Sequence, residues 1–283
     1  MGRGQRKVYC LNEIVHNPRV VRDLASRGLS FVRSVSEVPR GATLLFSAHG
    51  VPPSVRRKAD ERGLKVIDAT CPFVTKVHNE VRRYSKAGYR VLLVGDPSHE
   101  EVVGVVGEAP ENVEVVTDVD AARHVLAGSE SQPVAVVTQT TLNVREREHI
   151  IEVLQNRFDS LITPEKSDVC YATQNRQDAV TELAKRTQRV LVLGGRNSAN
   201  TNRLVEVADA AGGRGVLVES REDLRGLDWK GVEIVGLTAG ASTPDVFVRE
   251  VLRELAKRGY DDVEHLELAE EGMHFALPPE LRR

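Results

Sequence analysis

The chain has 283 residues, which is enough for two or three compact domains of ordinary size. Its 41% hydrophobic and 28% charged residues are typical of a globular protein, and no apolar run is long enough to span a bilayer. The net charge of −2 without a basic stripe argues against a nucleic-acid partner, and three widely separated cysteines argue against a disulfide framework. We therefore expect a cytoplasmic protein that binds neither membranes nor nucleic acids.

Residues 1–70 are predicted to form a small α/β unit. A strand over 7–11 is followed by the loop Glu13-Ile-Val-His-Asn17 and by a helix that begins at Val20. A second strand over 43–46 ends in Ser47-Ala-His-Gly50. Apolar, β-branched runs that alternate with amphipathic helical patterns indicate a parallel sheet.

Residues 71–169 are predicted to form a second unit that begins at a cysteine. Cys71 opens a helix over 73–87, and the next strand, over 91–94, ends at Gly95. The loop Ser98-His-Glu-Glu101 follows, and a later strand over 134–137 ends in Thr138-Gln-Thr-Thr141. A helix over 146–157 completes the unit.

Residues 170–269 repeat this order of elements. Cys170 opens a helix over 174–186, and a strand over 190–193 ends at Gly194, as far from its cysteine along the chain as Gly95 is from Cys71. The loop Asn197-Ser-Ala-Asn200, a strand that ends in Thr238-Ala-Gly-Ala-Ser242 and a helix over 246–257 follow. We predict three pseudo-threefold-related α/β units with mostly parallel sheets around a central site, a trefoil, with a tail over 270–283 that returns across the centre.

The first unit lacks the cysteine and the helix that open the other two. Counted back from a strand end near position 12, the missing cysteine would lie before Met1, and Cys10 lies inside the strand and cannot replace it. We expect a chain with an incomplete first unit, in which Val8, Leu44 and Phe46 face solvent or a poorly filled core. Such a chain is expected to be unstable or prone to aggregation, and catalytically weak, by itself.

Polar residues follow matched strands in all three units. They are His16 and His49 in the first unit, His99, Glu101 and Thr140 in the second, and Ser198, Asn200 and Ser242 in the third. Ligands of open parallel sheets bind beyond the carboxyl ends of the strands, where helix N-termini favour anions. Each residue alone could be a helix cap or an ordinary loop residue, but their recurrence predicts a polar anion site. The histidines without such a placement are predicted to be surface or packing residues: His124, His149, His265 and His274.

The cysteines suggest a metal site at the same place. Each of these repeats has a single cysteine, so the short paired cysteine spacing of structural zinc sites is missing. An iron–sulfur cluster held by three distant cysteines is chemically reasonable, because the fourth iron is then free to act as a Lewis acid. These residues do not by themselves identify a substrate.

The chain resembles the LytB family of iron–sulfur reductases from about Lys7 to Pro278. The motifs that carry the resemblance, in family order, are Glu13-Ile-Val-His-Asn17, Ser47-Ala-His-Gly50, Asp68-Ala-Thr-Cys-Pro72 with Thr75-Lys-Val-His78, His99-Glu-Glu-Val102, Thr138-Gln-Thr-Thr-Leu142, Asp168-Val-Cys-Tyr-Ala-Thr173 with Asn175-Arg-Gln177, Asn197-Ser-Ala-Asn-Thr-Asn-Arg203, Thr238-Ala-Gly-Ala-Ser242 and Phe275-Ala-Leu-Pro278. The family reductively removes the hydroxyl group of 4-hydroxy-3-methylbut-2-enyl diphosphate in non-mevalonate isoprenoid biosynthesis. A ferredoxin or a flavodoxin supplies its electrons.

The resemblance implies a role for each matched residue. Cys71 and Cys170 would be two of three ligands to a [4Fe-4S] cluster whose unique iron takes the substrate oxygen. Glu101 would supply the proton, Thr140 would position the hydroxyl group, and His99 would serve the proton relay. The residues implied around the diphosphate substrate are His16, His49, His99, Thr140, Ser198, Asn200 and Ser242.

Two departures from the family pattern leave a rival function open. Ala199 stands where the family often has a second serine, which removes a hydrogen-bond donor worth on the order of 1 kcal/mol. The Gly-x-Cys-x-Gly strand end of the family's first domain is also missing. The rival is a redox-silent, cluster-free descendant that still binds diphosphates. A zinc-dependent hydrolase, a second rival, needs a ligand spacing that the sequence lacks.

Overall fold

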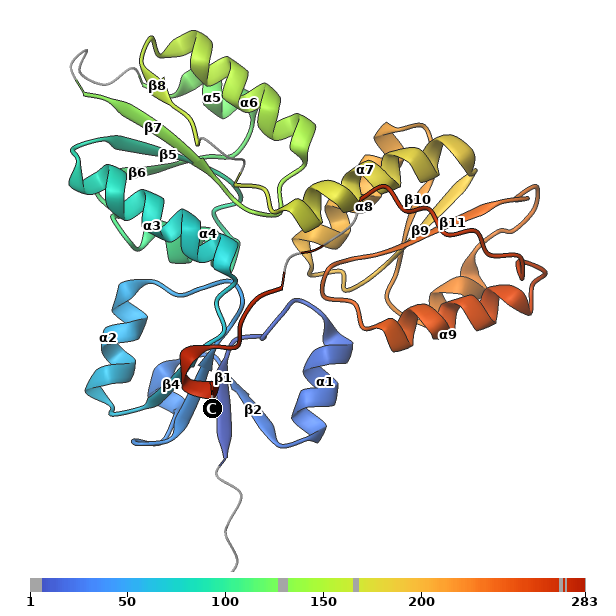
Figure 1. Cartoon of the computed structure of the whole chain (residues 1–283), viewed down its shortest axis with the longest axis horizontal. Helices are drawn as coiled ribbons and strands as arrows, with labels where there is room; N and C mark the ends of the chain where they lie inside the picture. Colours follow the sequence, from blue (N-terminus) through green and yellow to red (C-terminus); the bar gives the residue numbers. More distant parts are fainter. Residues whose placement is uncertain (1–6, 127–131, 165–167, 270–271, 273, 283) are drawn as a thin grey trace, which may run out of the picture. The chain divides into compact units, whose positions relative to one another are not determined.

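The computed structural model describes residues 7–126, 132–164, 168–269, 272 and 274–282. They form two compact units, one from the described residues of Met1–Val15, Asp23–Val169 and His274–Arg283, the other from those of His16–Arg22 and Cys170–Met273. The described ranges contain three sheets, and every strand pairing within them is parallel (Figure 1). The predicted α/β class with parallel sheets is confirmed. The unit boundaries and the arrangement around a common centre stay predictions.

The first sheet has the strand order β2-β1-β3-β4. Its strands are β1 (Val8–Leu11), β2 (Leu29–Val32), β3 (Thr43–Phe46) and β4 (Lys65–Asp68). The connecting helices are α1 (Pro18–Ser26), the 3₁₀ turn η1 (Val35–Glu37) and α2 (Pro53–Glu61). Leu11, Leu44 and Phe46 form one buried core with Ala59 of α2.

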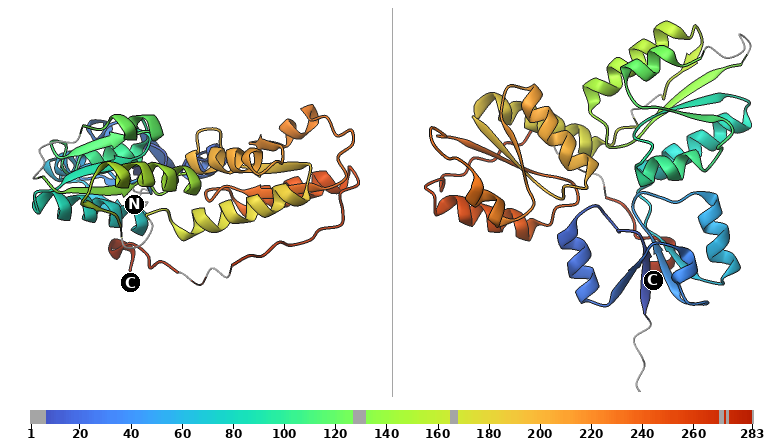
Figure 2. Two further views of the ribbon diagram at one scale, coloured as in Figure 1. Left: turned by 90° about the horizontal axis from the view of Figure 1, so that it is seen from above. Right: turned by 180° about the vertical axis from the view of Figure 1, so that it is seen from behind.

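The second sheet repeats this order as β6-β5-β7-β8. Its strands are β5 (Arg90–Val94), β6 (Val113–Val116), β7 (Val134–Thr138) and β8 (Leu161–Ile162). Its helices are α3 (Pro72–Lys86), α4 (Glu100–Val106), α5 (Val119–His124) and α6 (Val144–Arg157). Val91 and Leu93 pack toward α3 and α4, whereas Leu92 and Val94 pack toward α5 and α6. The two pairs of helices lie on opposite sides of this sheet (Figure 2). Both faces of the sheet are buried, which explains the continuous apolar run of β5.

The third sheet has the order β10-β9-β11. Its strands are β9 (Arg189–Leu193), β10 (Gly215–Val218) and β11 (Val235–Ala239). Its helices are α7 (Tyr171–Arg186), α8 (Ala199–Ala210), the 3₁₀ turn η2 (Arg221–Gly226) and α9 (Asp245–Ala256). His16–Arg22, which includes the start of α1, belongs to this unit. Arg19 pairs with Glu250 of α9 at 3.2 Å and lies 3.9 Å from the ring centre of Phe247. A last 3₁₀ turn, η3 (Pro279–Leu281), lies in the tail.

The ends of the first strands are equivalent in all three sheets. The N–H groups of Asn12, Gly95 and Gly194 donate to Val32, Val116 and Val218 at 2.8, 3.1 and 3.1 Å. These bonds confirm the predicted strand end at position 12. His16, His99 and Ser198 therefore occupy one position of the repeat, since each lies four residues beyond this strand end. Glu101 and Asn200 share a second position, two residues further on.

The matching of the third strands differs slightly from the prediction. Gln139 and Gly240 occupy equivalent positions, because their N–H groups donate to Val94 and Leu193 at 2.9 and 2.8 Å. Thr140 then matches Ala241, and Ser242 matches Thr141. Both predicted residues lie just beyond their strands, one position apart in the repeat.

The first sheet is less covered on one face than the other sheets. Val8 and Leu45 are only partly buried and line a hollow of about 550 Å³, whereas Val91, the equivalent of Val8, is fully buried. The prediction that Leu44 and Phe46 would face solvent or a poorly filled core is wrong. Both are buried against the opposite face, because side chains alternate along a strand. None of the helices in the described ranges combines the length and apolar character needed to cross a bilayer.

Candidate active site

Glu101 and Thr140 form a closely bonded pair beyond the carboxyl ends of β5 and β7. Thr140 donates its backbone N–H to Oε1 of Glu101 at 2.8 Å and its hydroxyl to Oε2 at 2.9 Å. Glu101 lies in the first turn of α4 and is fully buried. Burial raises the pKa of its carboxyl group, against the opposing effects of the Thr140 hydrogen bonds and of His49 and His78. The site thus contains an acid that holds its proton more tightly than an exposed glutamate.

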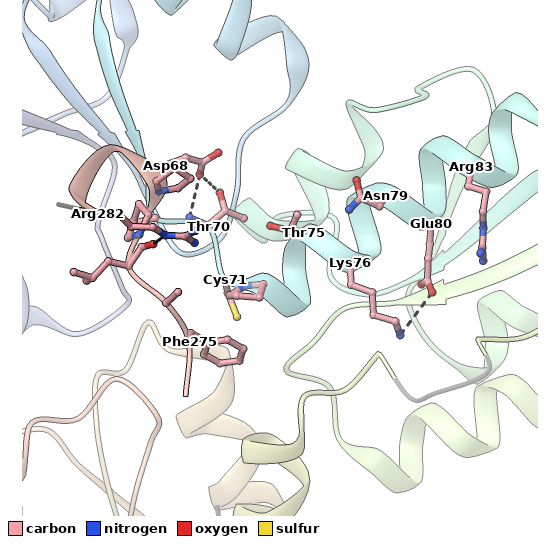
Figure 3. Close-up of a pocket in the computed structure, with 16 residues that line it drawn as sticks. Asp68, Thr70, Cys71, Thr75, Lys76, Asn79, Glu80, Arg83, Phe275 and Arg282 are labelled. Carbon is pink, nitrogen blue, oxygen red and sulfur yellow. Dashed lines mark hydrogen bonds and ion pairs between the residues drawn. The ribbon is translucent and has the colours of Figure 1, made fainter. Parts of the chain in front are cut away.

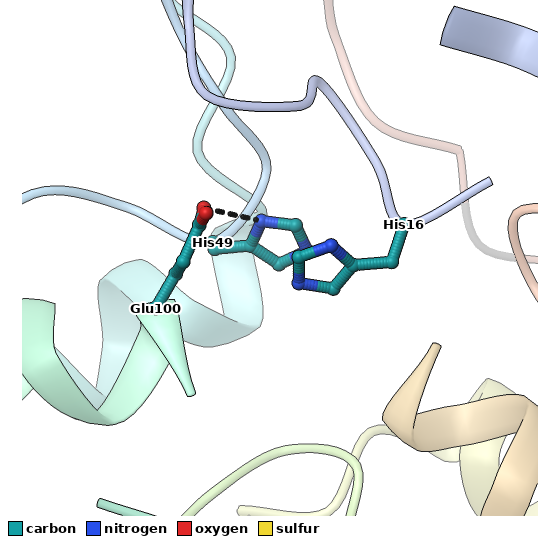
Figure 4. Close-up of side chains that lie close together, drawn as sticks. All are labelled: His16, His49 and Glu100. Atoms are coloured by element: carbon teal, nitrogen blue, oxygen red, sulfur yellow. Dashed lines mark ion pairs between the residues drawn. The ribbon is translucent and has the colours of Figure 1, made fainter. Parts of the chain in front are cut away.

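Two imidazoles lie at the same edge of the second sheet. His99 is the N-cap of α4, and its Nδ1 accepts the N–H of Glu101 at 3.2 Å. This bond makes Nδ1 an acceptor, so a neutral His99 carries its proton on Nε2, where it can be donated to a ligand. The rings of His49 and His99 meet edge to face with centroids 5.5 Å apart. His49 also pairs through Nδ1 with Oε2 of Glu100 at 3.3 Å (Figure 4).

Cys71 is the partly buried N-cap of α3. Its N–H donates to Ala48 at 3.0 Å, which ties it to the loop that carries His49. It opens onto a hollow of about 860 Å³ that runs along α3 past Lys76, Glu80 and Arg83 (Figure 3). The tail forms the other side of this hollow, where Phe275 meets Phe73 edge to face at 5.8 Å.

The three cysteines differ in their fitness as metal ligands. Cys170 is the partly buried N-cap of α7, and its Sγ accepts the N–H of Thr173 at 3.3 Å. A sulfur at a helix N-terminus is favourably placed to carry negative charge, so Cys71 and Cys170 suit an iron–sulfur cluster. Cys10 lies within β1 and is fully buried, and burial followed by the charge of Glu100 raises the pKa of its thiol to about 12. Cys10 does not fit a thiolate ligand.

The carboxyl edge of the third sheet carries the remaining predicted residues. Ser198 caps α8 and accepts the N–H of Thr201 at 3.3 Å. Asn200 is buried, and among the described residues neither its Oδ1 nor its Nδ2 has a hydrogen-bond partner. Ser242 donates its hydroxyl to the carbonyl of His16 at 3.4 Å, so these two residues lie together. A buried amide without a partner is costly, and a bound polar ligand would satisfy it.

Sequence reasoning missed the structural role of Asp168. Its buried carboxylate accepts Lys76 Nζ at 2.8 Å and the N–H of Thr138 at 2.9 Å. One side chain thereby joins α3, the end of β7 and the segment that leads to Cys170. A signal in the sequence could have revealed this role. An aspartate lies shortly before each of the two repeat cysteines, namely Asp68 before Cys71 and Asp168 before Cys170. The four histidines predicted to lie outside the site are all exposed: His124, His149, His265 and His274.

Comparisons with known proteins agree on one family. The family model described as LytB protein matches residues 2–256. The chain is 51% identical over 276 residues to 4-hydroxy-3-methylbut-2-enyl diphosphate reductase 1 of Mycobacterium bovis, covering 97% of this chain and 82% of that protein. It is 50% identical over 279 residues to 4-hydroxy-3-methylbut-2-enyl diphosphate reductase of Acidothermus cellulolyticus, covering 98% and 81%.

A solved structure matches the whole fold. The E-1-hydroxy-2-methyl-but-2-enyl-4-diphosphate reductase of Plasmodium falciparum superposes with a TM-score of 0.93 at 31% identity, over 98% of this chain and 87% of that one. A second structure, titled (E)-4-hydroxy-3-methyl-but-2-enyl diphosphate reductase, the terminal enzyme of the non-mevalonate pathway, gives a TM-score of 0.62 at 33% identity. It covers 90% of each chain.

Proposed function

The chain belongs to the LytB protein family, whose members are iron–sulfur enzymes, and we propose that it reductively dehydroxylates 4-hydroxy-3-methylbut-2-enyl diphosphate. The products are isopentenyl and dimethylallyl diphosphate, and the pathway is non-mevalonate isoprenoid biosynthesis. The observation that carries the proposal is the buried pair of Glu101 and Thr140. Cleavage of a carbon–oxygen bond that releases water needs a proton at the departing oxygen.

Glu101 is assigned as the proton source and Thr140 as the residue that positions the substrate hydroxyl. Burial keeps the carboxyl group of Glu101 protonated to higher pH than in water, which suits an acid that acts near neutrality. When Glu101 is protonated, one of its oxygens turns from acceptor to donor. The hydroxyl of Thr140 is then released from that oxygen and can bond to the substrate. His99, whose Nδ1 is held by the first turn of α4, is assigned to the proton relay.

Diphosphate binding is assigned to neutral and imidazole donors. These are His49, His99 and Thr140 in one compact unit and His16, Ser198, Asn200 and Ser242 in the other. The partnerless amide of Asn200 supports this assignment most directly, because its Nδ2 can donate to a phosphate oxygen without breaking an existing bond in the described structure. Such donors bind a diphosphate with little formal positive charge.

Cys71 and Cys170 are assigned as ligands of a [4Fe-4S] cluster, which when bound supplies electrons and a Lewis acid for the substrate oxygen. Their places at the N-termini of α3 and α7 support this assignment. Electrons come from a ferredoxin or a flavodoxin in the cytoplasm, where thiolates stay reduced.

The test is substrate-dependent oxidation of a reduced dye by anaerobically purified protein, combined with iron and sulfide analysis. We expect both cluster iron and turnover that depends on the diphosphate substrate. Protein that binds the diphosphate without iron or dye oxidation would contradict the proposal and favour the cluster-free rival.

A further inference from the structure

A buried histidine–glutamate pair that has no assigned role in the proposed chemistry lies beside α4. His78 of α3 is 4% exposed, and its Nδ1 lies 2.7 Å from Oε1 of Glu108, whose side chain is 6% exposed. Arg82 reaches the other oxygen of Glu108 at 3.5 Å. Since an ionised carboxylate only accepts hydrogen bonds, Nδ1 of His78 carries a proton. Within the described ranges, its buried Nε2 has no hydrogen-bond partner.

The imidazole of His78 is in close contact with two glycines next to assigned site residues. A Cβ atom on Gly50 would lie 2.8 Å from Nε2, and one on Gly104 would lie 3.4 Å from both Nε2 and Cε1. Gly50 directly follows His49. Its backbone φ is 77°, a conformation that residues with a side chain rarely adopt. Gly104 lies three residues after Glu101, on the same side of α4 and one turn further along.

The same loop and helix also approach each other directly. A Cβ atom on Gly104 would lie 3.6 Å from the carbonyl carbon of Gly50, and one on Gly107 would lie 2.3 Å from Cβ of Pro52. At Gly107 only a glycine permits this approach, whereas the distances at Gly104 are those of ordinary van der Waals contact. The ring of His78 therefore fills the corner where α3, α4 and the loop after β3 meet, and it limits where the last two can lie.

Packing alone does not require a histidine in this corner. A buried ion pair is costly to desolvate, and an apolar side chain of similar volume often stabilises a protein equally well. A histidine differs from an apolar side chain in that it can carry charge, which acts on Glu101 in the same direction as His49, favouring the ionised carboxylate against burial.

We propose that His78, held by Glu108, is a positioning residue that fixes the places of His49 and Glu101 and sets the charge around Glu101. The inference rests on the proposed function in that Glu101 is taken as the proton source. The charged and titratable groups around Glu101 in the described part of the chain are His78 with its partners Glu108 and Arg82, His49 from the loop after β3, and Glu100 and His99 at the start of its own helix.

The test variants are His78→Gln and, in case that protein does not fold, Glu108→Gln. The first removes the imidazole, and the second removes the carboxylate that lies 2.7 Å from its Nδ1. Exposed residues of the same unit provide matched controls, His124→Gln and Glu111→Gln. The titration of Glu101 is followed by carboxyl ¹³C NMR in the full-length protein, and its signal is assigned by its loss in Glu101→Gln.

We expect the titration midpoint of Glu101 to rise by about half a pH unit or more in His78→Gln, because a charge that lowers its pKa is lost. In Glu108→Gln the midpoint should shift less, because that variant removes the negative charge of Glu108 together with the contact that holds His78. Inorganic pyrophosphate should bind about threefold to tenfold more weakly to His78→Gln as His49 shifts. Both controls should match the wild type in both measurements. The pH profile of turnover should move with the titration of Glu101, which a purely structural role would not produce.

The outcomes separate this inference from the proposed function. Folded test variants with an unchanged Glu101 titration and unchanged pyrophosphate affinity would overturn the inference, even if the wild type is a fully active reductase. A shifted titration together with weaker pyrophosphate binding supports it. If both changes occur although the wild-type protein reduces no substrate, the inference stands and only the proposed function is overturned.

Discussion

Thr140 donates twice to Glu101, so one residue at the end of β7 holds both oxygens of a fully buried acid on α4. The two partners lie 39 residues apart in the sequence. Because both bonds point to the same side chain, the carboxyl group has little freedom to rotate. A proton donor fixed in this way needs little reorganisation at the moment of transfer.

Glu101→Gln is expected to lower turnover by about two orders of magnitude or more, as for loss of a general acid. The amide can accept the N–H of Thr140 and donate to its hydroxyl, so the fold and pyrophosphate binding should be retained. Anaerobic steady-state kinetics and pyrophosphate calorimetry provide the measurements. Glu152→Gln, on the exposed side of α6, is the control. Turnover close to that of the wild type would reject the assignment of Glu101.

The raised pKa of Glu101 predicts a pH dependence of both activity and stability. The pKa of such a group is higher in the folded than in the unfolded state. The group therefore stabilises the fold fully below the unfolded pKa, and this stabilisation is lost as pH rises through the folded pKa. Turnover should fall over the same rise, because the proton donor is lost. The urea midpoint of Glu101→Gln should lack this part of the pH dependence. Parallel pH curves for the variant and the wild type would contradict the prediction.

Glu80→Gln should make the protein more stable above neutral pH. Burial, and next the charge of Asp168, raise the pKa of Glu80 to about 7. As pH rises from the unfolded pKa to about 7, Glu80 ionises more easily in the unfolded chain than in the folded protein, which lowers the free energy of unfolding. The glutamine amide of Glu80→Gln does not ionise, so the variant avoids this loss. Urea unfolding should show a higher midpoint than the wild type at pH 8 and a similar one at pH 4. An equal difference at both values would show that charge is not the cause.

Asn200→Ala should weaken pyrophosphate binding about tenfold while hardly changing the free energy of unfolding. The amide has no partner among the described residues, so its removal breaks no bond of the described fold. The control is Asn202→Ala, because Nδ2 of Asn202 already donates to the carbonyl of Arg196 at 2.9 Å. Calorimetry and urea unfolding measure the two effects. A large loss of stability with unchanged binding would assign Asn200 a structural role.

Cys71→Ser and Cys170→Ser should each lower the iron content of anaerobically prepared protein, because each removes an assigned thiolate ligand. Cys10→Ala should leave the iron content unchanged, since this thiol is buried within β1. Iron and sulfide analysis and the visible absorption of the cluster provide the readout. Loss of iron in Cys10→Ala would show that Cys10 has been recruited as a ligand.

The repeat of the chain could be predicted from sequence because it depends on local patterns. The apolar runs at 91–94 and 190–193 lie within the strands Arg90–Val94 and Arg189–Leu193, and both cysteines cap the helices that they were predicted to open. At Gly50 the contact with His78 leaves no room for a Cβ atom, and no local pattern of the sequence encodes that contact.

Long-range pairs and strand faces were harder to predict. His78 and Glu108 are 30 residues apart, and Lys76 and Asp168 are 92 residues apart. Such pairs are set by the packing of helices, which a single sequence does not display. Leu44 and Phe46 were predicted to face solvent or a poorly filled core because the first unit lacks an opening strand and helix. The sequence does not show that their side of β3 meets α2.

The contact between Arg19 and Glu250 joins residues 231 positions apart within one compact unit. During synthesis at about 5–20 residues per second, Arg19 is made roughly 10–50 s before its partner. The first two sheets pair strands that are close in sequence and can form in that interval. A nascent chain that pauses before α9 has neither Glu250 nor Phe247 for the start of α1 to pack against. A ribosome that pauses before α9 therefore prolongs the time during which the start of α1 is exposed to holdase chaperones and proteases.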